Sequence, residues 1–234
     1  MKTVITDFRI DNEEKNNLEK LGFIVLNAGQ CDKLYNAVCG HPDMLIHIID
    51  DKNMMVYKSM DKSIIEELKR CGKTIILSQN ELIGKYPYDI CLNALNFNNF
   101  FIHNLKYTDE LLLKYVSKKN LINVKQGYTK CSTAVISENS IITSDTTIAS
   151  ALKKQNFDVL LLPPGDIILP GLDYGFIGGT CGLLDENHIA FYGNLKHYKY
   201  GNEVFKFLEK HKISPIFLRE GKLVDRGSIF AMNN

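Results

Sequence analysis

The chain of 234 residues is 45% apolar and carries a formal net charge of +1, from 28 basic and 27 acidic residues. This balance leaves no basic stripe for nucleic acid, and the longest apolar runs are far too short to cross a bilayer. The first fifteen residues lack the apolar stretch of a signal peptide. We therefore expect a cytoplasmic protein with one core, folded as a single domain over residues 1–234.

The six cysteines are spread along the chain without a CxxC pair, at positions 31, 39, 71, 91, 131 and 181. In a reducing compartment this spacing argues against a disulfide framework and against a structural zinc site. The sequence contains no cofactor motif and no metal motif, so we expect neither a cofactor nor a metal. The ordinary expectation for each cysteine is a small buried side chain.

Short apolar strands and amphipathic helices follow one another in a repeated order. The chain begins with a strand, a helix that stops at Gly22 and another strand, which we expect at Lys2–Thr6, Asn12–Leu21 and Phe23–Asn27. Four units of strand, strand, helix and strand follow. They are expected at Leu45–Asp50, Asn53–Lys58, Ser63–Cys71 and Thr74–Ser78; Cys91–Leu95, Phe100–His103, Asp109–Lys118 and Leu121–Val124; Thr133–Ser137, Ser140–Thr143, Ile148–Gln155 and Val159–Leu162; and Gly182–Leu184, Ile189–Gly193, Glu203–His211 and Ile216–Arg219.

A last strand, Ser228–Met232, has nothing after it and completes a fifth unit with the beginning of the chain. The first strands begin near residues 45, 91, 133, 182 and 228, at spacings of 46, 42, 49 and 46 residues. Near-constant spacing with a split unit predicts an α/β fold, a five-bladed propeller of ββαβ units with pseudo-fivefold symmetry. An open α/β sheet is the alternative. The hairpin before each helix and the missing glycine-rich phosphate loop argue against it.

In a closed ring, the residues just before each first strand come together around the axis. These positions hold His41-Pro42-Asp43, Asp89, Lys130-Cys131, Gly178–Cys181 and Asp225. A histidine, a carboxylate and a cysteine at equivalent positions form a nucleophile with a base. We therefore expect the sulfur of Cys131 and the ring of His41 to line one central cleft.

Two of these segments carry a family resemblance. Cys39–Met44 resembles the H-x-D motif of agmatine and arginine deiminases, and Tyr128–Ile136 resembles the nucleophile segment of dimethylarginine dimethylaminohydrolases. His41 and Cys131 are 90 residues apart, which is two repeats, as in that family. The order looks circularly permuted, since the blades that precede the histidine in the family follow the cysteine here. The resemblance implies the pentein fold of the guanidine-modifying enzymes.

The resemblance also implies the chemistry. Cys131 would attack the guanidinium carbon, and Asp43 would hold the guanidinium nitrogens. His41 would protonate the leaving amine and then activate water or an acceptor amine against a thiouronium intermediate. Lys130 and a protonated His41 would favour the Cys131 thiolate. The acidic pair that the family carries in the next blade is replaced by uncharged residues, so Asp225 is the candidate for a second carboxylate.

Other interpretations of the same residues stay open. Cys181 is a second candidate nucleophile, and Gly179 beside it allows a ligand to approach the backbone closely, so both join Lys130 and Asp225 as candidate substrate-binding residues. His41-Pro42-Asp43 also suits a simple turn, and Cys131 a core thiol. If the Cys131 thiol is partly exposed, Cys131→Ala should leave folding nearly intact.

We expect a small guanidine-like or amidine-like substrate, with no nucleic-acid or membrane partner, and a homodimer is compatible with the sequence. The function favoured is a hydrolase or an amidinotransferase. The alternatives are a non-catalytic ring that resembles the ribosome anti-association factor of this fold, and an interaction protein built on an open α/β sheet.

Overall fold

A computed structural model describes residues 2–232, so residue 1 and residues 233–234 of the predicted domain lie outside the described residues. Within the described range the chain forms fifteen short strands. They are β1 (Lys2–Thr6), β2 (Phe23–Asn27), β3 (Ile46–Ile48), β4 (Asn53–Val56), β5 (Thr74–Leu77), β6 (Leu95–Asn96), β7 (Phe100–His103), β8 (Asn120–Asn123), β9 (Thr133–Ser137), β10 (Ser140–Thr143), β11 (Asp158–Leu161), β12 (Cys181–Leu183), β13 (His188–Phe191), β14 (Ser214–Phe217) and β15 (Phe230–Met232).

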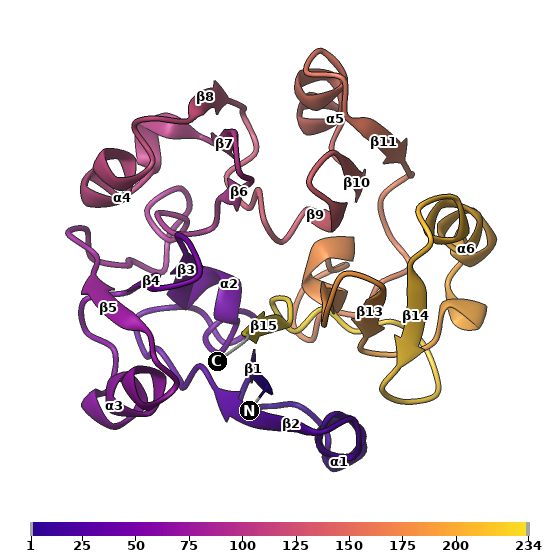
Figure 1. Cartoon of the computed structure of the whole chain (residues 1–234), viewed down its shortest axis with the longest axis horizontal. Helices are drawn as coiled ribbons and strands as arrows, with labels where there is room; N and C mark the ends of the chain where they lie inside the picture. Colours follow the sequence, from indigo (N-terminus) through magenta and orange to yellow (C-terminus); the bar gives the residue numbers. More distant parts are fainter. Residues whose placement is uncertain (1, 233–234) are drawn as a thin grey trace.

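The strands form five small mixed sheets of three strands each, in the orders β15-β1-β2, β3-β4-β5, β6-β7-β8, β11-β10-β9 and β12-β13-β14. In every sheet the middle strand pairs antiparallel with one neighbour and parallel with the other. Figure 1 shows the five sheets arranged around a common centre. The predicted order of strand, strand, helix and strand is therefore confirmed, and one open α/β sheet is excluded.

The helices connect the second and third strands of the sheets. They are α1 (Asn12–Lys20), α2 (Pro42–Leu45), α3 (Lys62–Arg70), α4 (Glu110–Tyr115), α5 (Thr146–Lys153) and α6 (Gly201–Lys210), with α2 as an extra turn before β3, and η1 (Leu105–Tyr107), η2 (Ile177–Thr180) and η3 (Leu195–His197) are 3-10 turns.

Local sequence explains where these helices begin and end. The side chains of Asp61, Asp109 and Asp145 accept hydrogen bonds from the first free backbone N–H groups of α3, α4 and α5. Gly22 and Gly72 follow α1 and α3 with φ of +87° and +78°, a left-handed conformation that glycine adopts without strain. The helix stop predicted at Gly22 is therefore confirmed, and Gly72 ends α3 in the same way.

The sheet β15-β1-β2 is assembled from both ends of the chain. β15 pairs antiparallel with β1, with Val4 opposite Ala231, and β1 pairs parallel with β2. Val4 and Met232 are buried in this sheet. The predicted split of the fifth unit between head and tail is confirmed by this pairing.

A central cavity of about 230 Å³ lies between the first strands of the five sheets. Its wall includes residues of β3, β6, β9, β12 and β15, together with Asp43 and Lys130. Since one strand from every sheet contributes, the segments that lead into those strands are brought near one another.

Three predicted first strands begin too early. The strand expected at Cys91–Leu95 is only Leu95–Asn96, the strand expected from Leu45 begins at Ile46, and β15 begins at Phe230. The residues ahead of each strand are buried and mostly apolar. Their apolar sequence suggested a strand. They instead form turns, which bring polar side chains between the sheets.

No helix within residues 2–232 has the length and apolar character needed to cross a membrane.

We predict that Met232→Ala lowers the free energy of unfolding by about 2–4 kcal/mol, because it opens a cavity where the last strand packs against the core. Leu77→Ala, at a 47% exposed position of β5, is the matched control and should cost less than about 0.5 kcal/mol. Urea unfolding of both variants checks this. Equal costs would mean that β15 is not part of the stabilising core.

Candidate active site

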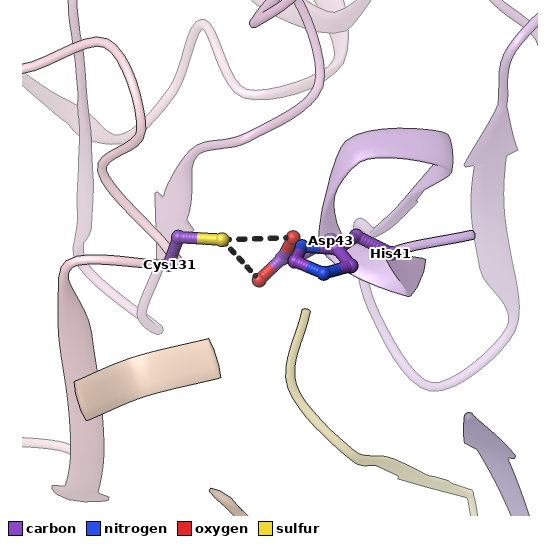
Figure 2. Close-up of side chains that lie close together, drawn as sticks. All are labelled: His41, Asp43 and Cys131. Atoms are coloured by element: carbon purple, nitrogen blue, oxygen red, sulfur yellow. Dashed lines mark hydrogen bonds between the residues drawn. The ribbon is translucent and has the colours of Figure 1, made fainter. Parts of the chain in front are cut away.

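The buried carboxylate of Asp43, in the single turn α2, contacts side chains from several of the segments that precede the first strands of the other sheets. Its two oxygens lie 3.1 and 3.0 Å from Cys131 Sγ. Figure 2 shows the sulfur of Cys131 pointing at this carboxylate. Ser228 Oγ lies 2.7 Å from Asp43 Oδ2, and Asn93 Nδ2 donates to Asp43 Oδ1 at 3.1 Å. The thiol, the hydroxyl and the amide therefore all bind one carboxylate.

The Asn93 side chain also fixes the backbone that carries the thiol. Its Oδ1 accepts the backbone N–H groups of Lys130 at 2.9 Å and of Cys131 at 3.2 Å. Asn93 is fully buried, and its amide oxygen and nitrogen are both used. A single side chain thus sets the position of Cys131 relative to Asp43.

The ring of His41 lies between two buried carboxylates. Its Nδ1 is 3.8 Å from Asp225 Oδ1, and its Nε2 is 3.9 Å from Asp7 Oδ2. Both ring nitrogens are buried and neither has a hydrogen-bond partner. His41 is therefore free to accept or donate a proton toward a group bound beside it.

The turn after Asp225 is shaped to fit against His41. A Cβ on Gly227 would come within 2.2 Å of His41 Cβ, and Gly227 has a φ of +68°. Ser228 is also left-handed, with a φ of +77°, which is uncommon for a residue with a side chain. Strain of this kind persists where surrounding contacts hold it, and here it presents the Ser228 hydroxyl to Asp43.

The remaining predicted residues surround this centre in different ways. Lys130 Nζ donates to Ser228 Oγ at 2.9 Å, so the ammonium group is linked to Asp43 through the Ser228 hydroxyl. Gly179 leaves room for the Asp225 carboxylate, because a Cβ at this position would lie 1.8 Å from Asp225 Oδ1. Cys181 is buried on the wall of the central cavity, and its thiol faces Ile177 O at 3.5 Å rather than a base.

The electrostatics of Cys131 differ from the prediction. Burial, followed by the negative charges of Asp43 and Asp225, raises the pKa of the Cys131 thiol well above its usual value. The predicted thiolate stabilisation by Lys130 and His41 does not outweigh burial and the charges of Asp43 and Asp225, of which Asp43 contacts the sulfur. Cys131 is only 2% exposed, so the condition for a harmless Cys131→Ala is not met.

Burial also raises the pKa of two other groups near the site, the Asp225 carboxyl and the Cys181 thiol. Burial raises the pKa of Asp225, and the nearby His41 opposes that rise. Burial raises the pKa of Cys181 to about 12, although Lys130 lowers it in part. Burial therefore favours the neutral thiol form of both cysteines.

Within residues 2–232, one set of three His, Cys, Asp or Glu side chains has converging ligand atoms. His41, Asp43 and Cys131 each offer an atom within 4.8 Å of the others. A nitrogen, an oxygen and a sulfur at these distances suit zinc as well as acid–base chemistry. The same trio was predicted from the repeat positions, and the structure brings its members together.

Sequence reasoning missed Asn93, Ser228 and Asp7. Asn93 and Ser228 fell within predicted strands, and Asp7 directly follows β1. The available signal was an isolated polar residue in an apolar run, Cys91-Leu92-Asn93-Ala94-Leu95, which on burial requires hydrogen-bond partners.

One protein-family model matches the chain, over residues 5–230, and its description is a family of unknown function (DUF6873). No curated protein has significant sequence similarity to the chain.

Solved structures share its fold. SxtG, an amidinotransferase from Microseira wollei in the saxitoxin biosynthetic pathway, has a TM-score of 0.57 at 10% identity, over 92% of this chain and 87% of that one. Dimethylarginine dimethylaminohydrolase from Pseudomonas aeruginosa, a mutant complexed with citrulline, has a TM-score of 0.55 at 8% identity, over 92% and 91%. The inosamine-phosphate amidinotransferase StrB1 from Streptomyces griseus has a TM-score of 0.52 at 12% identity, over 87% and 72%. At such identities the likeness is one of fold.

We predict that iodoacetamide modifies Cys131 slowly at pH 7 and at least about tenfold faster at pH 10, because the reactive thiolate forms only at high pH. Asp43→Asn should raise the rate at pH 7, because the charge of Asp43 raises the pKa of the Cys131 thiol more than that of Asp225 does. Mass spectrometry after timed quenching gives the rate at each cysteine. The less buried Cys71 is the internal control, and a Cys131 rate above that of Cys71 at pH 7 would contradict the interpretation.

Proposed function

The chain belongs to the family of unknown function DUF6873 and has the α/β fold of the guanidine-modifying enzyme (pentein) superfamily, and we propose that it is a cysteine-dependent enzyme that cleaves a guanidine-type C–N bond. The observation that carries the proposal is the buried trio of thiol, carboxylate and unpartnered imidazole. Its activity is that of a hydrolase or an amidinotransferase, depending on whether water or an amine accepts the amidino group.

The finer description of the fold belongs to the same proposal. The chain forms one closed domain, a five-bladed propeller with pseudo-fivefold symmetry. Support comes from five sheets of one topology and from a central cavity to which each sheet contributes its first strand.

A guanidinium fits the charge of the site. Asp43 and Asp225 are both buried, and His41 lies beside each of them. A planar cation between two carboxylates gains paired, charge-assisted hydrogen bonds. Its positive charge also offsets the two negative charges that raise the pKa of Cys131, so the thiolate forms when the substrate is bound.

The reaction then proceeds in two halves. The thiol proton passes to His41, and the Cys131 sulfur attacks the guanidinium carbon. The C–N bond breaks as His41 returns the proton to the leaving nitrogen, which departs as an amine and leaves a thiouronium on the sulfur. In the second half His41 takes a proton from water or an acceptor amine, which attacks the same carbon. The C–S bond breaks, releasing a urea or a new guanidine.

A non-catalytic binding protein of the same fold is the second candidate. The observations that favour it are the 2% exposure of Cys131 and the raised pKa of its thiol, because both describe an unreactive sulfur in the unliganded state. The two candidates differ in one property: only the enzyme forms a covalent bond between its cysteine and a guanidine carbon.

We predict that incubation with a panel of alkylguanidines, followed by acid quenching and mass spectrometry, finds an amidino adduct on Cys131. Cys131→Ser should lower turnover by at least about 1,000-fold, as expected for loss of a nucleophile. Cys181→Ser is the matched control, a buried thiol on the cavity wall, and should keep most of the activity.

The contrary outcomes are distinct. Turnover that survives Cys131→Ser and disappears in Cys181→Ser would assign the chemistry to the other thiol. Turnover that EDTA abolishes and zinc restores would mean that His41, Asp43 and Cys131 hold a metal instead. Binding of guanidines without any adduct or product would favour the non-catalytic candidate.

A further inference from the structure

The central cavity of about 230 Å³ is a space separate from the reactive trio. Asp43 and Lys130 contribute to its wall, whereas neither His41 nor Cys131 does. The other wall residues come from the first strands of the five sheets and from the residues just before them. A molecule in this cavity would therefore lie beside the site of the proposed reaction without occupying it.

The cavity is closed at one end. In β3, Ile46 at the beginning of the strand is buried and Ile48 at its end is half-buried. In β12, Cys181 is buried and Leu183 is half-buried. Solvent therefore reaches the wall at the ends of these strands. The two charged wall residues precede their strands, so they lie at the closed end of the cavity.

Most of the cavity wall is apolar, and two of its polar side chains are uncharged. Burial lowers the pKa of His47 to about 4, so this imidazole is neutral at pH 7. Asn96 Nδ2 donates to Ile48 O at 2.9 Å and to Ile49 O at 2.8 Å. Among the described residues, charge in the wall is therefore limited to Asp43 and Lys130.

The ammonium group of Lys130 has unused donors at the closed end. Its Nζ donates to Ser228 Oγ at 2.9 Å and lies 5.7 Å from the centroid of the Phe230 ring, which is also part of the wall. No carboxylate of residues 2–232 lies within ion-pair distance of it. An ammonium group has three donors, so Lys130 can donate to a further acceptor.

The Asp43 carboxylate is already surrounded by donors. Its Oδ1 lies 3.1 Å from both Cys131 Sγ and Asn93 Nδ2, and its Oδ2 lies 3.0 Å from Cys131 Sγ and 2.7 Å from Ser228 Oγ. These contacts offset its negative charge, whereas no carboxylate offsets the positive charge of Lys130. The closed end therefore favours an anionic group over a cationic one.

The volume of the cavity sets the size of the occupant. An engineered apolar cavity of about 150 Å³ binds one benzene molecule. A cavity of about 230 Å³ has room for such a ring together with a short acidic group. Apolar walls suit the ring, and the ammonium group suits a carboxylate.

We propose that the central cavity binds a small arylalkanoic acid, with its carboxylate on Lys130 and its ring between the first strands of the sheets. The carboxylate accepts the Lys130 donors that Ser228 does not use. This inference goes beyond the proposed function and does not rest on it, because binding in the cavity needs neither His41 nor Cys131.

The test compares three probes that share a phenyl ring and differ in charge: phenylacetate, phenylacetamide and phenethylamine. Calorimetric titration of each probe into the native protein at pH 7 gives its Kd. Phenylacetate should bind at least about tenfold more tightly than phenylacetamide, as expected for a hydrogen bond between two charged groups. Phenethylamine should bind more weakly than either.

Three variants locate the bound acid. Lys130→Met keeps the length of the side chain and removes its charge, so the preference for the acid over the amide should vanish. Lys125→Met removes an exposed lysine of the same segment and should leave the preference unchanged. Val135→Phe enlarges a residue of the cavity wall and should weaken the binding of phenylacetate and phenylacetamide alike. Thermal unfolding of each variant establishes that it is folded.

The contrary results are equally clear. If phenylacetamide or phenethylamine binds as tightly as phenylacetate, or if none of the probes binds, the acid site is overturned. A preference that survives Lys130→Met, or binding that survives Val135→Phe, places the acid elsewhere and overturns it as well. If Lys130→Met does not fold, the ranking of the three probes and the Val135→Phe result decide the question. None of these results bears on the proposed guanidine chemistry, which does not use the cavity.

Discussion

The Asp43 carboxylate is the interaction on which the rest of the arrangement depends. It lies in the segment before β3 and binds Cys131 from the segment before β9, Ser228 from the segment before β15 and Asn93 from the segment before β6. Ser228 also lies 2.9 Å from Gly178 O, ahead of β12. This carboxylate thus connects four of the five sheets directly and the fifth through Ser228, so the contacts that arrange the reactive groups also hold the sheets around their centre.

The same contacts disfavour the reactive thiolate form of Cys131. Asp43 contacts the Cys131 thiol, the charges of Asp43 and Asp225 raise the pKa of that thiol, and Lys130 donates to Ser228. Burying like charges together is unfavourable, and in the proposed reaction the guanidinium would offset that cost. The proposed chemistry therefore needs no permanently activated cysteine, which would be open to oxidation.

Much of the fold and the central trio could be predicted from the sequence because repetition is visible in it. Equivalent repeat positions predict that His41, Asp43 and Cys131 lie together, and β1 does pair with β15. The sequence could not supply the direction of the pKa shift of Cys131, which depends on burial and on which charges face the sulfur. Asn93 and Ser228 were missed because apolar neighbours suggested strands, where the chain forms turns instead.

The pairing of β1 with β15 also has a consequence for synthesis of the chain. Contacts between distant parts of a sequence carry a high entropic cost of closure, and this pair joins residues more than 220 positions apart. During translation β1 and β2 leave the ribosome more than 200 residues before the antiparallel neighbour of β1 is made. The nascent chain therefore carries an open strand edge until β15 emerges, and a chaperone that shields such edges would act on it in that interval.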